Sequence, residues 1–184
     1  FSKSLKIIGK QINQIENLVN EFSDFARMPK PILKNNNLVP LIKDNINLLN
    51  ELDMDITINF KINKSTIVLN SDNEQLNRVF FNLIKNSVES IQDKKINNLN
   101  FKGTIDIFLN DNGSSLDFII IDNGLGFEIF ADNIKNILNP YFTTKEKGTG
   151  LGLAIVNKII NDHNGKIDFI SIKNGAKIHI IFIK

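Results

Sequence analysis

Asn82 and Asn86 are four residues apart in a segment whose apolar residues recur with helical periodicity. Residues at this spacing lie on the same face of a helix, so the two side-chain amides are neighbours one turn apart. Amide oxygens are suitable ligands for a hard cation such as Mg²⁺, which binds oxygen and keeps water or phosphate in its other positions. Taken alone, two surface amides in an asparagine-rich chain explain the pair at least as well, and both interpretations stay open.

A carboxylate and two glycines follow one of the longest apolar runs of the chain. Asp122 comes directly after residues 118–121 (Phe-Ile-Ile-Ile), and Gly124 and Gly126 come after it. A carboxylate at the end of a strand can accept a hydrogen bond from an exocyclic amine, and glycines allow a ligand to approach the backbone. An ordinary turn is the alternative.

Two further segments have residue types suited to phosphate. Residues 139–145 (Asn-Pro-Tyr-Phe-Thr-Thr-Lys) offer hydroxyls and a lysine that could line a phosphate channel, with Phe142 folded inward as an apolar anchor; an ordinary loop is the alternative. Residues 148–153 (Gly-Thr-Gly-Leu-Gly-Leu) lead straight into a predicted helix, whose free N-terminal N–H groups favour anions. This glycine loop does not follow an apolar strand, so its context argues against a Rossmann site.

The elements that must position these segments are predicted from periodicity. A long helix over residues 3–27 has apolar residues alternately three and four apart from Leu5 to Ala26, a heptad seam typical of a helix that packs against another helix. Pro29 and Pro31 end it, and a linker is expected over residues 28–37. Further helices are expected over 38–51, from a capping box at Ser71 and Glu74 to about Ile91, and over 150–162, with Asn37 capping the first of these. Strands are expected over 56–62, 66–69, 104–109, 115–121, 166–172 and 177–183.

The composition bounds the function. The chain has 184 residues, 42% of them hydrophobic, which is enough for a real core. The absence of cysteine excludes disulfides, thiolate metal sites and cysteine nucleophiles, and two histidines exclude a multi-histidine metal site. A net charge of +2 gives no case for nucleic-acid binding. No apolar run approaches the length of a membrane span and no secretory signal is visible, so a soluble, intracellular protein is expected.

Taken together and in this order, the four segments resemble the N, G1, F and G2 boxes of the Bergerat-type nucleotide-binding fold of histidine kinases, gyrase, Hsp90 chaperones and MutL. Residues 82–89 and 142–153 resemble sensor histidine kinases in particular. Residues 21–31 (Glu-Phe-Ser-Asp-Phe-Ala-Arg-Met-Pro-Lys-Pro) resemble the nitrogen-regulation kinases of the NtrY type. The resemblance covers essentially the whole chain. It implies an α+β class fold, a two-layer α/β sandwich with a mixed, mostly antiparallel sheet, helices on one face and one long helix before it.

The resemblance also implies the ligands, ATP and Mg²⁺, and the residues that bind them. Asn86 would ligate Mg²⁺, Asn82 would lie beside it near the phosphates, and Asp122 would accept a hydrogen bond from the adenine amino group. The residues with catalytic roles would be Asn82, Asn86 and Lys145, the last in a flexible lid. The nucleotide-binding set would be Asn82, Lys85, Asn86, Glu89, Asp122, Gly124, Gly126, Phe142, Thr143, Thr144, Lys145, Gly148, Thr149, Gly150, Leu151, Gly152 and Leu153.

In terms of domains, the resemblance implies that residues 1–28 are the second helix of a dimerisation and phosphotransfer hairpin, that 29–37 are a linker and that 38–184 are the catalytic ATP-binding domain. In the family the acceptor histidine lies on the first hairpin helix, and the sequence contains no such segment. His163 is expected at a helix end and His179 on a terminal strand. The fragment is therefore expected to bind ATP without forming phosphohistidine by itself.

The implied partners are the chain's own hairpin, as a homodimer in the parent protein, and a response regulator, with no nucleic acid and no membrane contact by this fragment. The expected location is the cytoplasm, including the cytosolic part of an inner-membrane sensor. Two alternatives remain: a non-catalytic nucleotide-sensing or dimerisation module, and an ATPase like gyrase or Hsp90. Those ATPases carry a glutamate as general base at the position of Asn82, whose amide cannot take that proton, and Glu89 lies two turns away.

Overall fold

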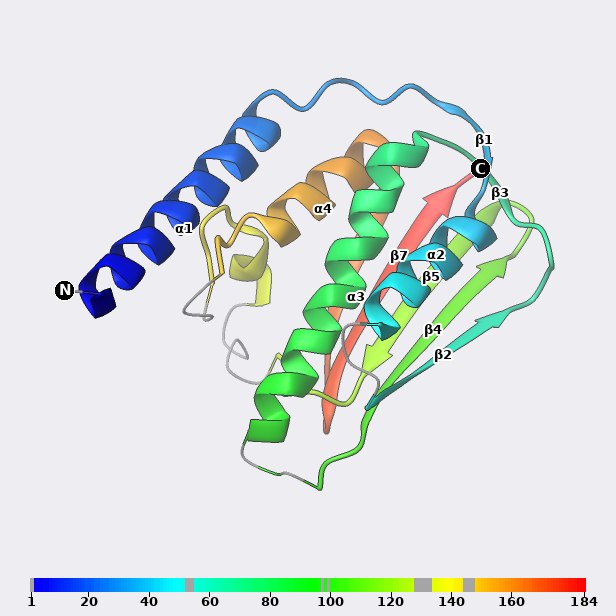
Figure 1. Cartoon of the computed structure of the whole chain (residues 1–184). Coiled ribbons are helices and arrows are strands. Elements are labelled where there is room, and N and C mark those ends of the chain that lie inside the picture. Colours follow the sequence, from blue (N-terminus) through cyan, green and yellow to red (C-terminus); the bar gives the residue numbers. More distant parts are fainter. Residues whose placement is uncertain (1, 52–54, 97, 99, 128–133, 144–147) are drawn as a thin grey trace.

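A five-stranded sheet with helices packed against one face forms the main body of the chain (Figure 1). The structure, a computed structural model, describes residues 2–51, 55–96, 98, 100–127, 134–143 and 148–184. In chain order the elements are α1 (Ser2–Ala26), β1 (Lys34–Asn37), α2 (Leu38–Asn50), β2 (Ile56–Ile62), β3 (Val68–Ser71), α3 (Asn73–Ile96), β4 (Gly103–Asp111), β5 (Ser115–Asp122), the 3₁₀ helix η2 (Ile134–Leu138), α4 (Gly152–Asp162), β6 (Gly165–Ile172) and β7 (Gly175–Ile183). The predicted fold class is confirmed.

The sheet has the strand order β2-β4-β5-β7-β6, and only the β2–β4 pair is parallel. Successive residues of a strand point to opposite faces, so each strand gives one set of side chains to the helices and one to the outside. On β4 the inward set is fully buried, with Ile105, Ile107 and Leu109 all at 0% exposure. This alternation is the pattern from which the strands are predicted, and it fixes which face the helices cover.

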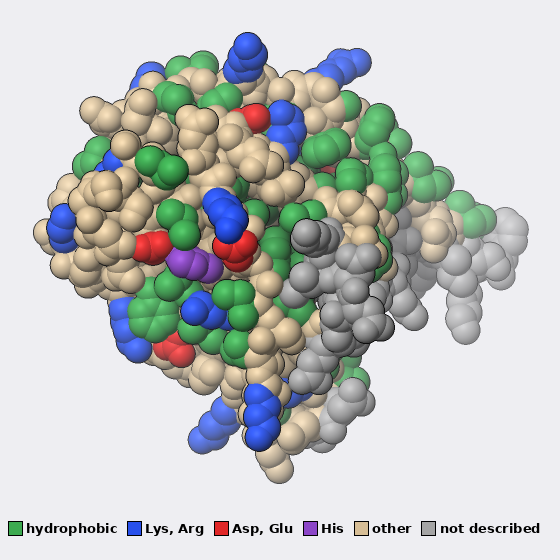
Figure 2. All heavy atoms as spheres, turned by 180° about the vertical axis from the view of Figure 1, so that it is seen from behind, with side chains coloured by type: hydrophobic (Ala, Val, Ile, Leu, Met, Phe, Trp, Pro, Cys, Tyr) green, Lys and Arg blue, Asp and Glu red, His purple; other side chains and the backbone are tan. Residues whose placement is uncertain are grey.

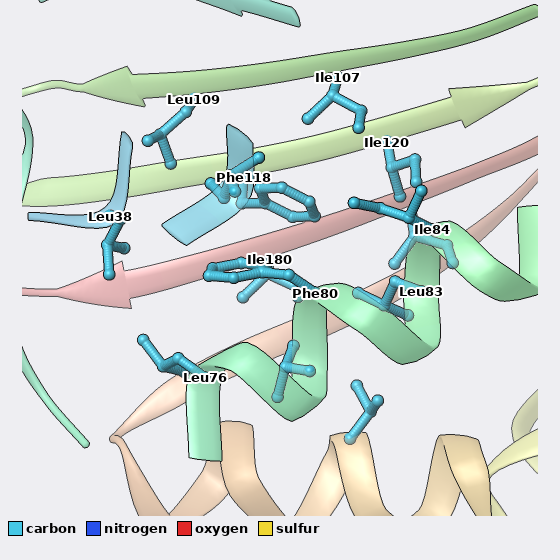
Figure 3. Packing of buried hydrophobic residues seen from close by; sticks show 14 of the residues in the cluster. Leu38, Leu76, Phe80, Leu83, Ile84, Ile107, Leu109, Phe118, Ile120 and Ile180 are labelled. Carbon is cyan, nitrogen blue, oxygen red and sulfur yellow. The ribbon is translucent and has the colours of Figure 1, made fainter. Parts of the chain in front are cut away.

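Helix α3 contributes one whole face to the core. The ring of Phe80 lies 4.8 Å, centroid to centroid, from the ring of Phe118 on β5. Figure 3 shows the two rings facing each other, with Ile84 and Ile120 beside them. All four side chains are buried. Because this face of α3 is apolar apart from Ser87, most of the polar side chains are left to the flanks of the helix, where they are available to a site.

The start of α3 differs from the predicted capping box. Ser71 is the last residue of β3, and the helix begins at Asn73. Asp72 caps it instead: its Oδ1 accepts the backbone N–H groups of Glu74 and Gln75, both at 3.1 Å. Aspartate caps a helix as well as serine does, so the sequence allowed two adjacent starts and the prediction chose the wrong one.

The predicted linker over residues 28–37 contains a strand that the sequence pattern does not reveal. Residues Lys34–Asn37 form β1 and pair antiparallel with β3 in a separate two-stranded sheet. Their sequence, Lys-Asn-Asn-Asn, has no hydrophobic alternation, so pairing alone makes it a strand. Asn37 caps α2 as predicted, since its Oδ1 accepts the N–H of Val39 at 3.2 Å, and it also accepts the N–H of Ile67 at 3.1 Å.

Helix α1 lies apart from the sheet (Figure 1). The seam residues Leu5, Ile8, Ile12, Ile15, Val19 and Phe22 are between 45% and 62% exposed. Only near its end does the chain reach the core, where Phe25 and Met28 pack against it. The described part of the chain contains no helix that is both long and apolar enough to cross a membrane.

Among the residues that the structure describes, no second layer covers the face of the sheet opposite the helices. Figure 2 shows hydrophobic, acidic and basic side chains mixed over the molecule as seen from behind. His179 is paired with Ile119 in the β5–β7 register and its Nε2 lies 2.8 Å from Asp117 Oδ1. The site described below lies on the helix side of the sheet.

Candidate functional site

The carboxylate of Asp122 lies buried at the end of β5, on the helix side of the sheet. The side chain is 5% exposed. Its Oδ1 accepts the backbone N–H of Gly124 at 2.9 Å, and its Oδ2 accepts the hydroxyl of Ser87 on α3 at 3.1 Å. Burial raises the pKa of Asp122, while these two hydrogen bonds act in the opposite direction. A hydrogen bond from the N–H of Ala176 on β7 and the positive charge of Lys94 also oppose the rise.

The turn after Asp122 is held against α3 by side chains of the helix. Ser90 Oγ accepts the N–H of Leu125 at 2.9 Å. Lys94 Nζ donates to the carbonyls of Asn123 and Gly124, at 2.7 and 2.8 Å. A Cβ at Gly124 would lie 2.3 Å from Ser90 Oγ, so glycine is required for this close approach. The turn is therefore fixed from the helix side.

The two predicted amides lie along α3 towards the start of α4. Both Asn82 and Asn86 are half-buried. Asn82 Nδ2 donates to the carbonyl of Arg78 at 2.9 Å, as an amide one turn on along the same helix can. A Cβ placed at Gly152 would lie 3.5 Å from Asn82 Oδ1, so this oxygen faces the first residue of α4. The predicted N and G2 segments are thus brought together.

Lys85 and Glu89 lie on the same helix but further from these contacts. Their side chains form an i, i+4 ion pair with an N–O separation of 3.8 Å, and the side chain of Lys85 is 50% exposed. The surface position of Lys85 argues for a solvated pair rather than for a group enclosed by a site. Both residues stay predictions as nucleotide contacts.

Helix α4 begins without a side-chain cap. Its N-cap residue is Leu151, which gives no side-chain capping hydrogen bond, and among the described residues Thr149 Oγ1 accepts the N–H of Leu151 itself at 3.4 Å. The side chains of Leu151 and Leu153 belong to or pack against the core, so only their backbone can serve a ligand. An uncapped helix N-terminus leaves N–H donors and the positive end of the helix dipole available to an anion.

The glycine loop before α4 packs against the segment that ends near residue 143. Gly150 has a φ of 70°, and its carbonyl accepts the N–H of Tyr141 at 3.1 Å. The hydroxyl of Thr149 donates to the carboxylate of Glu21 on α1. The ring of Tyr141 stacks on Phe22 of the same helix, with 6.4 Å between centroids. This end of the site therefore has α1 as a neighbour.

Only part of the predicted lid lies within the described residues. Phe142 is 38% exposed, and the aromatic ring that stacks on α1 is that of Tyr141. The role of Phe142 as an inward apolar anchor stays a prediction. Thr143 and Gly148 are exposed. Thr144 and Lys145 lie outside the described residues, so their assignment stays a prediction.

Three residues of α3 near Asp122 are missing from the predicted set: Ser87, Ser90 and Lys94. Two of them continue the Asn82–Asn86 spacing, since Ser90 and Lys94 are four and eight residues beyond Asn86. That periodicity is the signal by which they could have been found. Asn82, Asn86, Ser90 and Lys94 thus form a polar row along one flank of α3. The polar row runs from the start of α4 to the turn after β5.

A separate open hollow of about 590 Å³ lies between α2 and α3, lined by residues that include Leu41, Asn45, Asn77 and Phe81. Asn77 and Phe81 lie on the opposite flank of α3 from the polar row. The hollow is therefore distinct from the site described above.

Known proteins are similar to this chain both in sequence and in structure. The family described as "Histidine kinase-, DNA gyrase B-, and HSP90-like ATPase" matches residues 71–184. A sensor histidine kinase of Rickettsia prowazekii, described as NtrY-like, is 35% identical over 183 residues, which are 99% of this chain and 29% of that protein. The chain thus spans less than a third of the length of this curated relative.

Solved structures agree on the fold. The nucleotide-free catalytic domain of the histidine kinase ThkA has a TM-score of 0.70 and 28% identity, covering 83% of this chain and 95% of that one. A structure of ThkA in complex with the response regulator protein TrrA has a TM-score of 0.76 and 22% identity, covering 99% of this chain and 51% of that one. The second likeness bears on the fold alone.

Proposed function

Because the chain belongs to the family of histidine kinase-, DNA gyrase B- and HSP90-like ATPases, we propose that it is the ATP-binding catalytic part of a sensor histidine kinase. In this proposal residues 38–184 bind ATP and present its γ-phosphate to a histidine of the dimerisation hairpin. The phosphate then passes to an aspartate of a response regulator. Phosphoryl transfer needs mainly positioning and charge neutralisation, and the groups proposed below would serve these two tasks.

The purine end of the proposed site is at Asp122. A carboxylate has about four lone-pair positions. The hydrogen bonds from Gly124, Ser87 and Ala176 leave one position for the amino group of adenine. Burial strengthens such a bond because water does not compete for it. The remaining acceptor position of Asp122 therefore fits the adenine amino group.

The phosphate end is at the start of α4. The uncapped N–H groups there and the glycine backbone of residues 148–152 are proposed to hold the phosphates. Asn86, with Asn82 beside it, is proposed to hold Mg²⁺, which neutralises phosphate charge when bound. Lys145 is proposed as a further phosphate contact.

Neither histidine of this chain suits the role of acceptor. His163 is 6% exposed, with Nδ1 2.8 Å from the carbonyl of Ile159 and Nε2 accepting the N–H of Asp72 at 3.0 Å. His179 points to the sheet face opposite the helices, where it contacts Asp117. We propose that the acceptor belongs to the first hairpin helix, against which the exposed seam of α1 would pack.

The single observation that carries the proposal is the polar row of α3. At one end of the row Asn82 faces Gly152, and further along it Ser90 contacts Leu125 beyond Asp122. Eight residues of helix separate these contacts, a rise of about 12 Å. The row thus joins an anion-binding helix end to a purine-binding carboxylate, as an extended nucleotide requires.

The two rival functions make different predictions. An ATPase of the gyrase or Hsp90 kind needs a general base for water, and Asn82 cannot act as one. A nucleotide-sensing module would bind ATP without passing phosphate on. Mixing this chain with a separate hairpin that bears the acceptor histidine distinguishes them: radiolabel from γ-labelled ATP should appear on the hairpin.

The direct test of the site is calorimetric titration with an ATP analogue, with and without Mg²⁺. We expect binding that Mg²⁺ strengthens, and Asn86→Ala should remove the Mg²⁺ dependence. Lys61→Ala, on β2 at the uncovered face, is the control and should bind like the wild type. A folded wild-type chain that binds no adenine nucleotide would contradict the proposed function.

A further inference from the structure

Lys94 is the last member of the polar row of α3, and its ammonium group lies under the turn that follows Asp122. Nζ donates to the carbonyls of Asn123 and Gly124 at 2.7 and 2.8 Å. The same nitrogen lies 4.7 Å from the centroid of the Phe101 ring. A lysine that bonds two successive carbonyls and an aromatic face is fixed at its tip, unlike a solvated surface lysine.

The other side of the turn is fixed separately. Asn123 Oδ1 accepts the N–H of Thr104 at 2.9 Å, and its Nδ2 donates to the carbonyl of Lys102 at 2.9 Å. These bonds tie the turn to the start of β4, while Lys94 and Ser90 tie it to α3. The bonds of Lys94 are the charge-assisted ones, and such bonds are about twice as strong as neutral ones.

We propose, on the basis of the proposed function, that Lys94 is a positioning residue for purine selection. By holding the carbonyls of Asn123 and Gly124 it sets the direction of the Asp122 carboxylate relative to the amides of α3. Lys94 does not itself touch the nucleotide, because its donors are directed to the backbone of the turn.

The charge of Lys94 has a second effect on the same carboxylate. Burial raises the pKa of Asp122, and Lys94 is the charged group that opposes this rise; the other opposing groups, Gly124, Ser87 and Ala176, are neutral. An Asp122 that has taken up a proton no longer offers a free acceptor on that oxygen. Without the ammonium group of Lys94, Asp122 should take up its proton at a higher pH than in the wild type, and the preference for adenine should be lost at that higher pH.

The test compares ADP with inosine diphosphate, which carries a carbonyl oxygen where adenine has its amino group. Dissociation constants of both are measured by calorimetry for the whole chain and for Lys94→Met, which keeps the apolar stem. We expect the wild type to prefer ADP and the variant to lose about tenfold of that preference, the value of one hydrogen bond to a charged group. Affinity for inosine diphosphate should change little.

Three further variants separate positioning from general stability. Lys94→Arg keeps the charge and the donors, and it should retain most of the preference. Lys95→Met makes the same change at the next residue, where the lysine Nζ lies 3.9 Å from Asp55. This variant should keep the full preference for ADP over inosine diphosphate. Lys94→Gln keeps one neutral donor and is expected to give an intermediate ratio if Lys94→Met does not fold.

The outcomes distinguish the inference from the function. A wild type that binds ADP better than inosine diphosphate, with the same ratio in folded Lys94→Met and Lys94→Gln, would overturn the inference and leave the proposed function standing. A wild type that binds neither nucleotide would overturn both. A pH profile adds an independent readout, because the ratio should fall at a higher pH in Lys94→Gln than in the wild type.

Discussion

The two ends of the proposed nucleotide site are built differently. At the purine end, Asp122 and the turn after it are fixed by hydrogen bonds with Ser87, Ser90 and Lys94, all on α3. At the phosphate end, the chain before α4 packs against residues 139–143 and against α1. The first set of contacts lies within the body of the domain, while the second depends on where α1 lies.

This difference indicates a division of tasks. A preformed purine end gives affinity and selectivity without a cost for ordering the chain on binding. The phosphate end also depends on contacts with α1. It can therefore respond to the position of α1, because those contacts stabilise only one arrangement of α1 and the loop before α4. We therefore expect substitutions at the two ends to affect different measured quantities.

The largest expected effect is that of Asp122→Asn on ADP binding. The amide keeps the shape of the side chain but replaces an acceptor by a donor, so the bond to the adenine amino group is lost. We expect ADP affinity to fall about 10- to 100-fold, the range for a hydrogen bond to a charged group. Asp117→Asn on the uncovered face is the control. Equal affinities in calorimetry would remove Asp122 from the purine end.

Matched glycine substitutions compare the two ends by stability. A Cβ at Gly124 would lie 2.3 Å from Ser90 Oγ, whereas one at Gly152 would lie at an ordinary 3.5 Å from Asn82 Oδ1. We expect Gly124→Ala to lower the free energy of unfolding by about 1–3 kcal/mol. Gly152→Ala should change it by less than about 1 kcal/mol. Urea unfolding measures both, and a reversed order would contradict the rigid purine end.

The pH dependence of purine selection follows from the buried carboxylate. Because burial raises the pKa of Asp122 above its usual 3.8, the ionised acceptor is lost earlier on acidification than it is for an exposed aspartate. The ratio of ADP to inosine diphosphate affinity should therefore fall on acidification, and it should do so at a higher pH than an exposed aspartate would give. The two nucleotides share their phosphates, so phosphate titration cancels in the ratio. A ratio that rises on acidification would contradict the predicted loss of the Asp122 acceptor.

The smallest expected effect is at the contact between α1 and the phosphate end. A double-mutant cycle of Phe22→Leu and Tyr141→Leu should give a coupling energy of about 0.5–1 kcal/mol in the free energy of unfolding, as for a stacked aromatic pair. Phe22→Leu alone should leave the ADP to inosine diphosphate ratio unchanged. A zero coupling energy would mean that the stacked rings do not hold the two segments together.

The sequence predicted the layers of the fold because they follow from periodicity. The alternation of residues 105–109 and 116–120 marks one buried face, and the helical spacing of Leu76, Phe80 and Leu83 marks the helix that covers it. Strand β1 escaped prediction because its residues are polar and its partner, β3, is more than thirty residues away. Pairing across such a distance has no local signature.

The site residues that belong to short sequence motifs were predictable, and those that depend on tertiary packing were not. Asp122 stands out by the glycines that follow it, and Asn82 by its spacing of four residues from Asn86. Ser87, Ser90 and Lys94 are ordinary helix residues until the turn after β5 is known to pack against them. Their roles depend on tertiary contacts, which a single sequence does not encode in any short pattern.

The pairing of β1 with β3 limits how far α1 and the sheet can separate. Only residues 27–33 lie between the end of α1 and the first residue of β1. Even fully extended, this tether spans roughly 24 Å. Hydrogen bonds from Gln75 to the carbonyl of Pro29 and from Ile32 to Asp72 shorten it further while they hold. A domain that binds nucleotide at the start of α4 would therefore stay close to the last turn of α1 even when the two parts move relative to each other.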